Sequence, residues 1–109
     1  EIIQESGATF TEDLESTVTE SDLITTDVWV SMGHEEDSEN RLNEFNLYQV
    51  SPALMDLAKT DCIFLHCLPA NRGQEVSEDM LEDPRSKVWT QAENRLHAQK
   101  ALLLKLLDY

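Results

Sequence analysis

Two short apolar runs, each followed by small polar residues, constrain the fold of this chain more than any other feature. Residues 23–30 and 62–65 are rich in large apolar, β-branched and aromatic side chains, which is typical of buried strands. Segments with helical patterns separate and follow them, and strands that alternate with helices indicate a parallel sheet. Ligands bind at the carboxyl ends of such strands. We therefore predict an α/β domain, a Rossmann-like parallel sheet with flanking helices, whose ligand site lies where the two runs end.

The C-terminal part of the chain supplies a third predicted strand and a long helix. Residues 87–90 read Lys-Val-Trp-Thr and form that strand, and the helix runs over residues 92–107. We place Trp89, like Trp29, in the core. Three strands are few for a parallel sheet, because each strand needs a paired neighbour and cover on both faces. We therefore expect the sheet to be incomplete at its N-terminal side, with one or more strands upstream of Glu1.

Shorter helices are predicted from capping signals and from the spacing of apolar residues. Residues 11–14 and 19–22 each carry a hydroxyl side chain followed by acids, and Ser51-Pro52 places a proline in a first helical turn. Residues 76–81 suit one more short helix. In the final helix, residues 101–104 are apolar on most sides, which is usual for a helix buried on more than one face. We expect that helix to pack against a part of the protein outside this chain.

Size and composition narrow the class of protein. The 109 residues suit one domain, and a formal charge of −14, from 22 acidic and 8 basic residues, argues against binding to nucleic acid or to anionic membrane surfaces. No apolar run approaches the roughly 20 residues that span a bilayer. The two cysteines are too few for a disulfide framework and form no zinc motif. We predict a cytoplasmic protein without a metal site, in which most ligands for any bound phosphate come from elsewhere.

Three polar residues near the ends of the predicted elements are candidate site residues, and each also has a structural interpretation. Asp27 is either a cap for a neighbouring loop or a ligand for an ammonium group. Cys67 is either a small core residue, as we expect for Cys62, or part of a site. Its neighbour His66 points to the opposite face of the strand, so the two form no nucleophile pair. Arg95 makes a surface salt bridge or binds an oxyanion through its forked guanidinium.

Three motifs in a fixed order carry a resemblance to a known family. Residues 27–33 read Asp-Val-Trp-Val-Ser-Met-Gly, residues 66–69 read His-Cys-Leu-Pro, and residues 93–103 read Glu-Asn-Arg-Leu-His-Ala-Gln-Lys-Ala-Leu-Leu. With these motifs the chain resembles the aspartate/ornithine carbamoyltransferase family, in particular its ornithine carbamoyltransferases, over nearly its whole length. The resemblance implies that residues 1–109 are part of the C-terminal, ornithine-binding domain. The carbamoyl-phosphate-binding domain, with its Ser-Thr-Arg-Thr and His-Pro-x-Gln segments, is absent from this chain.

The resemblance implies an enzyme that transfers the carbamoyl group of carbamoyl phosphate to the side-chain amine of L-ornithine, giving L-citrulline and phosphate. In the family, Asp-x-x-x-Ser-Met-Gly is the loop for the amino-acid substrate. Asp27, Ser31 and Met32 are therefore implied to bind ornithine, with Asp27 on the amino side. The loop also moves over the substrate in the family, which would exclude water. Neither a metal nor an organic cofactor is implied.

The other two motifs imply contacts with carbamoyl phosphate. By resemblance, Cys67 and the backbone of Leu68 lie at the carbamoyl carbon and at the attacking nitrogen, and Arg95 reaches carbamoyl phosphate. Cys67 and Asp27 are thereby the implied catalytic residues. The Leu68-Pro69 bond is a candidate cis peptide, because cis bonds are nearly confined to X-Pro. A cis bond there would turn the Leu68 carbonyl into the site.

The resemblance leaves alternatives for the substrate and implies partners. It implies a homotrimer, or a multiple of trimers, in which the missing N-terminal domain makes most contacts, and it implies that this chain alone is inactive. The amine could instead be putrescine or N-acetylornithine, although Ser-Met-Gly favours ornithine because aspartate-specific relatives lack it. Outside the enzyme class, a non-catalytic amino-acid-binding or interaction domain would also keep the sheet. Asn71 departs from the His or other bulky polar residue expected there.

Overall fold

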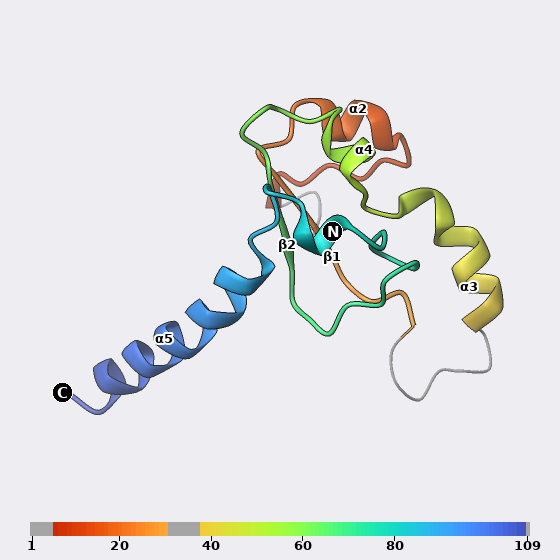
Figure 1. The fold of residues 1–109 in the computed structure, drawn as a ribbon. Coiled ribbons are helices and arrows are strands. Elements are labelled where there is room, and N and C mark those ends of the chain that lie inside the picture. The colour runs from red at the N-terminus through yellow and green to blue at the C-terminus, as the bar shows by residue number, and fades with distance from the viewer. Residues whose placement is uncertain (1–5, 31–37, 109) are drawn as a thin grey trace.

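The computed structural model describes residues 6–30 and 38–108, which fold around a pair of parallel strands. β1 (Leu23–Thr26) pairs with β2 (Ile63–His66), with Leu23 opposite Ile63 and Thr26 opposite His66. The helical elements are, in order, α2 (Leu14–Thr19), α3 (Ser38–Phe45), η2 (Asn46–Tyr48), α4 (Pro52–Met55), η3 (Met80–Glu82) and α5 (Val88–Leu106). In Figure 1, α2 and α4 lie at one end of the strands, while α3 and α5 lie on opposite sides. The predicted α/β class, a parallel sheet with flanking helices, is confirmed.

The core lies on one face of β2, where apolar side chains from several parts of the chain converge. Phe64 is fully buried and His66 is 1% exposed, whereas the alternate residues Ile63 and Leu65 are partly exposed, as strand geometry requires. The other members of this core are Val50, Met55, Cys62, Val76, Met80, Leu81 and Val88. Cys62 is therefore a core residue, as predicted, and the fold is centred on β2.

Side-chain caps explain where the short helices begin and end. Ser51 accepts a hydrogen bond from an N–H in the first turn of α4, as predicted. A helix also starts within residues 11–14, as predicted, but its cap is the carboxylate of Asp13 and not a hydroxyl group. The helix predicted to start at residues 19–22 is wrong. There, the hydroxyls of Thr19 and Ser21 donate back to carbonyl groups of α2 and so terminate that helix.

The third strand predicted at residues 87–90 is wrong, because α5 already begins at Val88. Ser86 instead makes an isolated parallel bridge with Phe64 of β2. The long run of helix-favouring residues that follows outweighs a strand pattern of four residues. Val88 is fully buried in the core, whereas Trp89 is 57% exposed, so the placement of Trp89 in the core is also wrong. Consecutive helical residues point about 100° apart, so only one of the two can face the core.

Two other predicted elements are shorter than expected. The strand predicted over residues 23–30 ends at Thr26, so Asp27 lies just beyond the strand rather than inside it. The helix predicted over residues 76–81 is reduced to η3, because Val76 forms parallel bridges with neighbouring segments. Both changes lengthen the loops around the strand ends, where ligand-binding residues are usually found.

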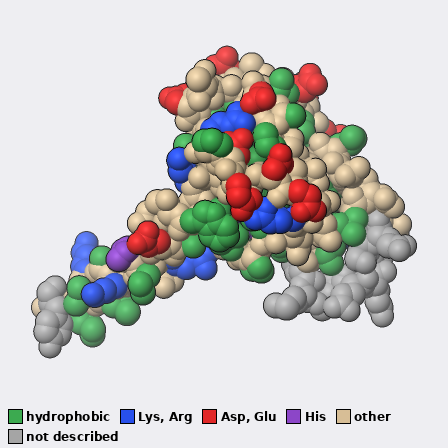
Figure 2. Space-filling model, in the orientation of Figure 1, with side chains coloured by type: hydrophobic (Ala, Val, Ile, Leu, Met, Phe, Trp, Pro, Cys, Tyr) green, Lys and Arg blue, Asp and Glu red, His purple; other side chains and the backbone are tan. Residues whose placement is uncertain are grey.

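α5 leaves the body of the protein as a long arm (Figure 1). From Ala92 to Leu106 every residue of this helix is exposed. Figure 2 shows hydrophobic side chains interleaved with charged ones along it. No helix within the described ranges is both long and apolar enough to cross a membrane. The packing of this arm against a region outside the chain stays a prediction.

Candidate active site

Asp27, Cys67 and Arg95 meet at the carboxyl ends of β1 and β2, although they lie far apart in the sequence. Asp27 directly follows β1, Cys67 directly follows β2, and Arg95 lies in the second turn of α5. The Cys67 thiol donates a hydrogen bond to the Asp27 carboxylate, with 3.0 Å between Sγ and Oδ1. Arg95 donates from Nη2 to the Cys67 carbonyl oxygen at 2.7 Å. Two hydrogen bonds therefore join the three candidate residues from three separate motifs.

The contact with Asp27 fixes the protonation of the Cys67 thiol. Hydrogen bonds from Cys67 and from the Val28 N–H lower the pKa of the Asp27 carboxyl. The pKa of the Cys67 thiol is raised, because its hydrogen bond to Asp27 needs the proton and because a thiolate would be repelled by the carboxylate. At neutral pH the pair is consequently a neutral thiol beside a carboxylate. Such a thiol donates a hydrogen bond but is a poor nucleophile.

The loop after β2 has the geometry that the sequence predicted. The Leu68-Pro69 peptide bond is cis, and Leu68 has a φ of 54°. The Leu68 N–H donates to Nδ1 of His66 at 2.9 Å. His66 is buried, whereas Cys67 is partly exposed and bonded to Asp27, so the two neighbours have different partners. They form no Cys/His nucleophile pair, as predicted.

Two further side chains, which no sequence pattern indicated, bind this region. Gln91 accepts a hydrogen bond from the His66 N–H at 3.0 Å, and it lies four residues before Arg95, on the same face of α5. Glu75 is fully buried, with its Oε1 atom 3.4 Å from Nε2 of His66. Neither residue belongs to one of the three motifs. A single sequence carries no signal for such contacts, because they join residues that are distant along the chain.

The other predicted ornithine-binding residues, Ser31 and Met32, lie outside the described residues. In the part of the chain that the structure describes, no group of three or more His, Cys, Asp or Glu side chains could hold a metal ion. The described part of the candidate site therefore combines a carboxylate, a thiol and a guanidinium. These groups suit the binding of an amine and of an oxyanion.

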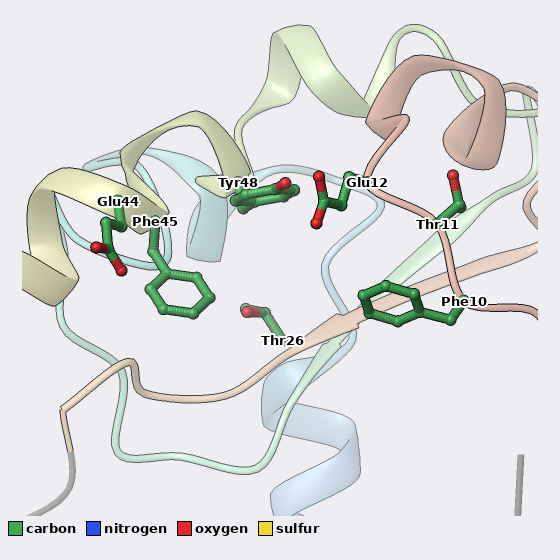
Figure 3. Close-up of a pocket in the computed structure, with 7 residues that line it drawn as sticks. All are labelled: Phe10, Thr11, Glu12, Thr26, Glu44, Phe45 and Tyr48. Atoms are coloured by element: carbon green, nitrogen blue, oxygen red, sulfur yellow. The ribbon is translucent and has the colours of Figure 1, made fainter.

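A pocket of about 640 Å³ lies against Thr26, the residue before Asp27. Figure 3 shows Phe10 on one side of Thr26 and Phe45 on the other, with Tyr48 facing the same space. The remaining lining residues are Thr11, Glu12 and Glu44. Among the described residues, those that line this pocket include aromatic rings and carboxyl groups but no basic side chain. The pocket therefore suits an apolar or amine-bearing group better than a phosphate.

Comparison with known proteins identifies the family. A sequence model described as aspartate/ornithine carbamoyltransferase, Asp/Orn binding domain, matches residues 1–106. The chain belongs to this family. The resemblance inferred from the three motifs is therefore confirmed.

This Asp/Orn binding domain is similar in sequence to bacterial ornithine carbamoyltransferases. It is 55% identical over 96 residues to the one from Psychrobacter cryohalolentis, a match that covers 88% of this chain and 32% of the relative. It is 58% identical over 87 residues to the anabolic one from Pseudomonas aeruginosa, which covers 80% of this chain and 28% of the relative. The chain thus spans about a third of the length of the curated relatives it matches.

Solved structures of the family have the same fold. The ornithine carbamoyltransferase from Thermus thermophilus matches with a TM-score of 0.84 and 40% identity, over 97% of this chain and 34% of that one. An N-acetyl-L-ornithine transcarbamylase matches with a TM-score of 0.74 and 26% identity, over 95% of this chain and 32% of that one. The sequence is therefore more similar to the first of these two enzymes than to the second.

Proposed function

We propose that the protein containing this chain transfers the carbamoyl group of carbamoyl phosphate to the side-chain amine of L-ornithine, giving L-citrulline and phosphate. The observation that carries the proposal is the convergence of Asp27, Cys67 and Arg95 in a chain 55% identical to an ornithine carbamoyltransferase. In this proposal, residues 1–109 form part of the ornithine-binding domain. A domain outside this chain supplies most of the carbamoyl phosphate site, because the 8 basic residues here are scattered along the sequence.

In this proposal the carboxylate and the thiol bind different parts of ornithine. A free alkyl ammonium has a pKa near ~10, so the site must favour the neutral amine before its lone pair attacks the carbonyl carbon. Asp27 accepts a hydrogen bond from an amino group of ornithine. Cys67 contacts the attacking nitrogen, and its Sγ atom is 3.0 Å from Oδ1 of Asp27. As the new C–N bond forms, the C–O bond to phosphate breaks, and the departing phosphate accepts the proton that the nitrogen loses. Ser31 and Met32 complete the ornithine contacts.

Arg95 and the Leu68 carbonyl act on carbamoyl phosphate, Arg95 as a donor and the carbonyl as an acceptor, because the Leu68 N–H already donates to His66. A guanidinium has five N–H donors, and the bond to the Cys67 carbonyl uses one, which leaves others for an oxyanion. Negative charge builds up on the carbonyl oxygen and on the departing phosphate, so donors fixed in place lower the barrier. The proposal invokes neither a metal nor an organic cofactor, because positioning and charge stabilisation are sufficient for this transfer.

The substrate amine and the biological setting are part of the same proposal. N-Acetylornithine is the second candidate, because an N-acetyl-L-ornithine transcarbamylase shares the fold with a TM-score of 0.74. Its 26% identity, against 40% for the Thermus thermophilus ornithine enzyme, favours ornithine. Putrescine and a non-catalytic amino-acid-binding or interaction role are further alternatives. We propose a cytoplasmic homotrimer, or a multiple of trimers, in which a separate N-terminal domain makes most subunit contacts.

An assay of ureido products tests these alternatives. The full-length protein is incubated with carbamoyl phosphate and, in turn, with ornithine, putrescine, N-acetylornithine or aspartate. We expect citrulline from ornithine and no product from the other amines. Turnover of another amine alone would replace the substrate and keep the chemistry. A folded full-length protein that turns over none of them would support the non-catalytic role. The 109-residue chain alone should form no citrulline.

A further inference from the structure

Two buried polar side chains, His66 and Glu75, have no role in the chemistry proposed above, yet both bind the loop that carries Cys67. His66 is 1% exposed and Glu75 is fully buried. Their side chains lie 3.4 Å apart, between Nε2 and Oε1. Burial of polar side chains costs stability unless they have hydrogen-bond partners, so the groups that they bind indicate what the pair does.

The hydrogen bonds of this pair go to the two ends of one loop. Nδ1 of His66 accepts from the Leu68 N–H at 2.9 Å, and Oε1 of Glu75 accepts from the Asn71 N–H. Because Nδ1 is an acceptor, the neutral imidazole carries its proton on Nε2, the atom that faces Glu75. The imidazole and the carboxyl group lie 3.4 Å apart without a hydrogen bond between them, and each accepts from one end of residues 68–71, so that the pair forms a clasp on this loop.

The backbone of each member of the pair is itself held by pairing with another segment. His66 is the last residue of β2, lies opposite Thr26 of β1, and donates its N–H to Gln91. The carbonyl oxygen of Glu75 accepts from the Val50 N–H at 2.9 Å. The clasp consequently connects the loop to the sheet and to the core, which are the most rigid parts of the fold.

We propose that His66 and Glu75 are positioning residues that hold residues 67–71 so that Cys67 and the Leu68 backbone face the substrates, an inference that rests on the proposed function. Cys67 stands between His66 and the residue whose N–H His66 binds, so the clasp restricts the backbone on both sides of it. Loss of the clasp would let the Cys67 thiol move away from Asp27. It would also misplace the groups at the reacting carbon.

Substitutions at His66 can separate its two contacts. Asn places an amide oxygen near the position of Nδ1, whereas Gln places its amide near that of Nε2. In the full-length protein we expect His66→Asn to keep kcat with ornithine within about fivefold of the unchanged protein. We expect His66→Gln to lower kcat by about 10- to 100-fold, with a smaller change in KM, because the loop is misplaced. Equal losses of kcat in the two variants would overturn the proposal.

Alkylation of Cys67 by iodoacetamide tests the same inference without catalysis. A Cys67→Ser variant measures the background from other thiols, including Cys62, which is 1% exposed. Asp27 raises the pKa of the Cys67 thiol, so a thiol displaced from Asp27 ionises more readily and reacts faster. We expect faster alkylation in His66→Gln than in His66→Asn, with Asp27→Asn as a positive control. An unchanged rate in a folded His66→Gln protein would overturn the proposal.

Glu75→Gln provides an independent test if His66→Gln does not fold. The N–H of Asn71 and Nε2 of His66 both face the same oxygen, Oε1, so Gln keeps one acceptor there but loses the negative charge that strengthens these contacts. It also buries an NH₂ group at the position of Oε2, which has no hydrogen-bond partner in the described structure. We expect Cys67 alkylation to become about threefold faster, a loss equivalent to one weak hydrogen bond. Glu20→Gln, at an exposed residue after α2, is the matched control and should cause no change. If Glu75→Gln behaves like this control, the pair does not position the loop.

The two readouts distinguish failure of this inference from failure of the proposed function. A protein without transferase activity whose alkylation rates follow the predicted order would refute the proposed function and support the positioning role. An active enzyme whose kcat and alkylation rates do not respond to His66→Gln or Glu75→Gln would refute the positioning role alone.

Discussion

The core around β2 and the arm of α5 belong to the same short chain, yet they are held in place differently. Segments from distant parts of the sequence bury the core, so packing stabilises it. The arm is exposed from Ala92 to Leu106, so it depends on its own backbone hydrogen bonds and on the turns that attach it. Val88, Gln91 and Arg95 make that attachment. Packing in the core therefore places the candidate site, whereas most apolar side chains of the arm make no contribution to the core.

The largest effect on folding should come from the centre of the core. Phe64→Ala should lower the free energy of unfolding by about 3–5 kcal/mol, because it removes a fully buried ring and leaves a cavity. Urea unfolding of the 109-residue chain measures it. Phe10→Ala, at a ring that is 78% exposed, is the matched control and should cost less than about 0.5 kcal/mol. Similar losses in the two variants would show that β2 is not the centre of the core.

At the attachment, Arg95→Ala should chiefly affect activity. If Arg95 binds an oxyanion as proposed, kcat/KM for ornithine in the full-length protein should fall by about 10²- to 10³-fold, because that donor beside Cys67 is lost. Lys100→Ala, which removes an exposed cation from the same helix, should leave the rate unchanged. Equal effects of the two substitutions would indicate that the charge of the helix matters and that the contact with Cys67 does not.

Gln91→Ala tests the second link between the arm and β2. It leaves the His66 N–H without its acceptor, so the free energy of unfolding should fall by about 1–3 kcal/mol. The control is Gln99→Ala, at an exposed position two turns further along α5. A urea titration that gives the same midpoint for both variants would mean that the link contributes nothing to stability.

The smallest effect in this chain should come from the arm itself. Leu103 is 59% exposed, so Leu103→Ala should change the free energy of unfolding of the 109-residue chain by less than about 0.5 kcal/mol. In the full-length protein the same substitution should cost about 2–5 kcal/mol if another region covers the arm. The ratio of the two losses in free energy of unfolding therefore measures how much of the Leu103 side chain is buried by other parts of the full-length protein.

Sequence motifs singled out three residues that the structure brings together, whereas sequence patterns predicted the elements that carry these residues less well. Asp27, Cys67 and Arg95 each belong to a motif, and the cis Leu68-Pro69 bond follows from the special chemistry of proline. The strand predicted at residues 87–90 failed because four residues of β pattern compete with a long helical run, and only the whole fold decides between them.

The partners of His66 could not be predicted for a different reason. Glu75 and Gln91 act through contacts with His66, which is nine residues from the first and 25 residues from the second. A carboxyl or an amide group in a polar segment has no distinguishing pattern, because the same side chains are common on solvated surfaces. Only the fold shows that these two face inward.

The contacts that attach α5 to the rest of the described structure lie near its start, where Arg95 is. A small tilt at that end therefore moves the other end of the helix much further. The axis from Arg95 to Leu106 is about 16 Å long, at 1.5 Å per residue. A tilt of about 10° at the attached end therefore moves the far end by roughly 3 Å, and a far end held still prevents that tilt. A contact with the last turns of the helix would therefore hold the Arg95 guanidinium against the loop after β2 without touching that loop.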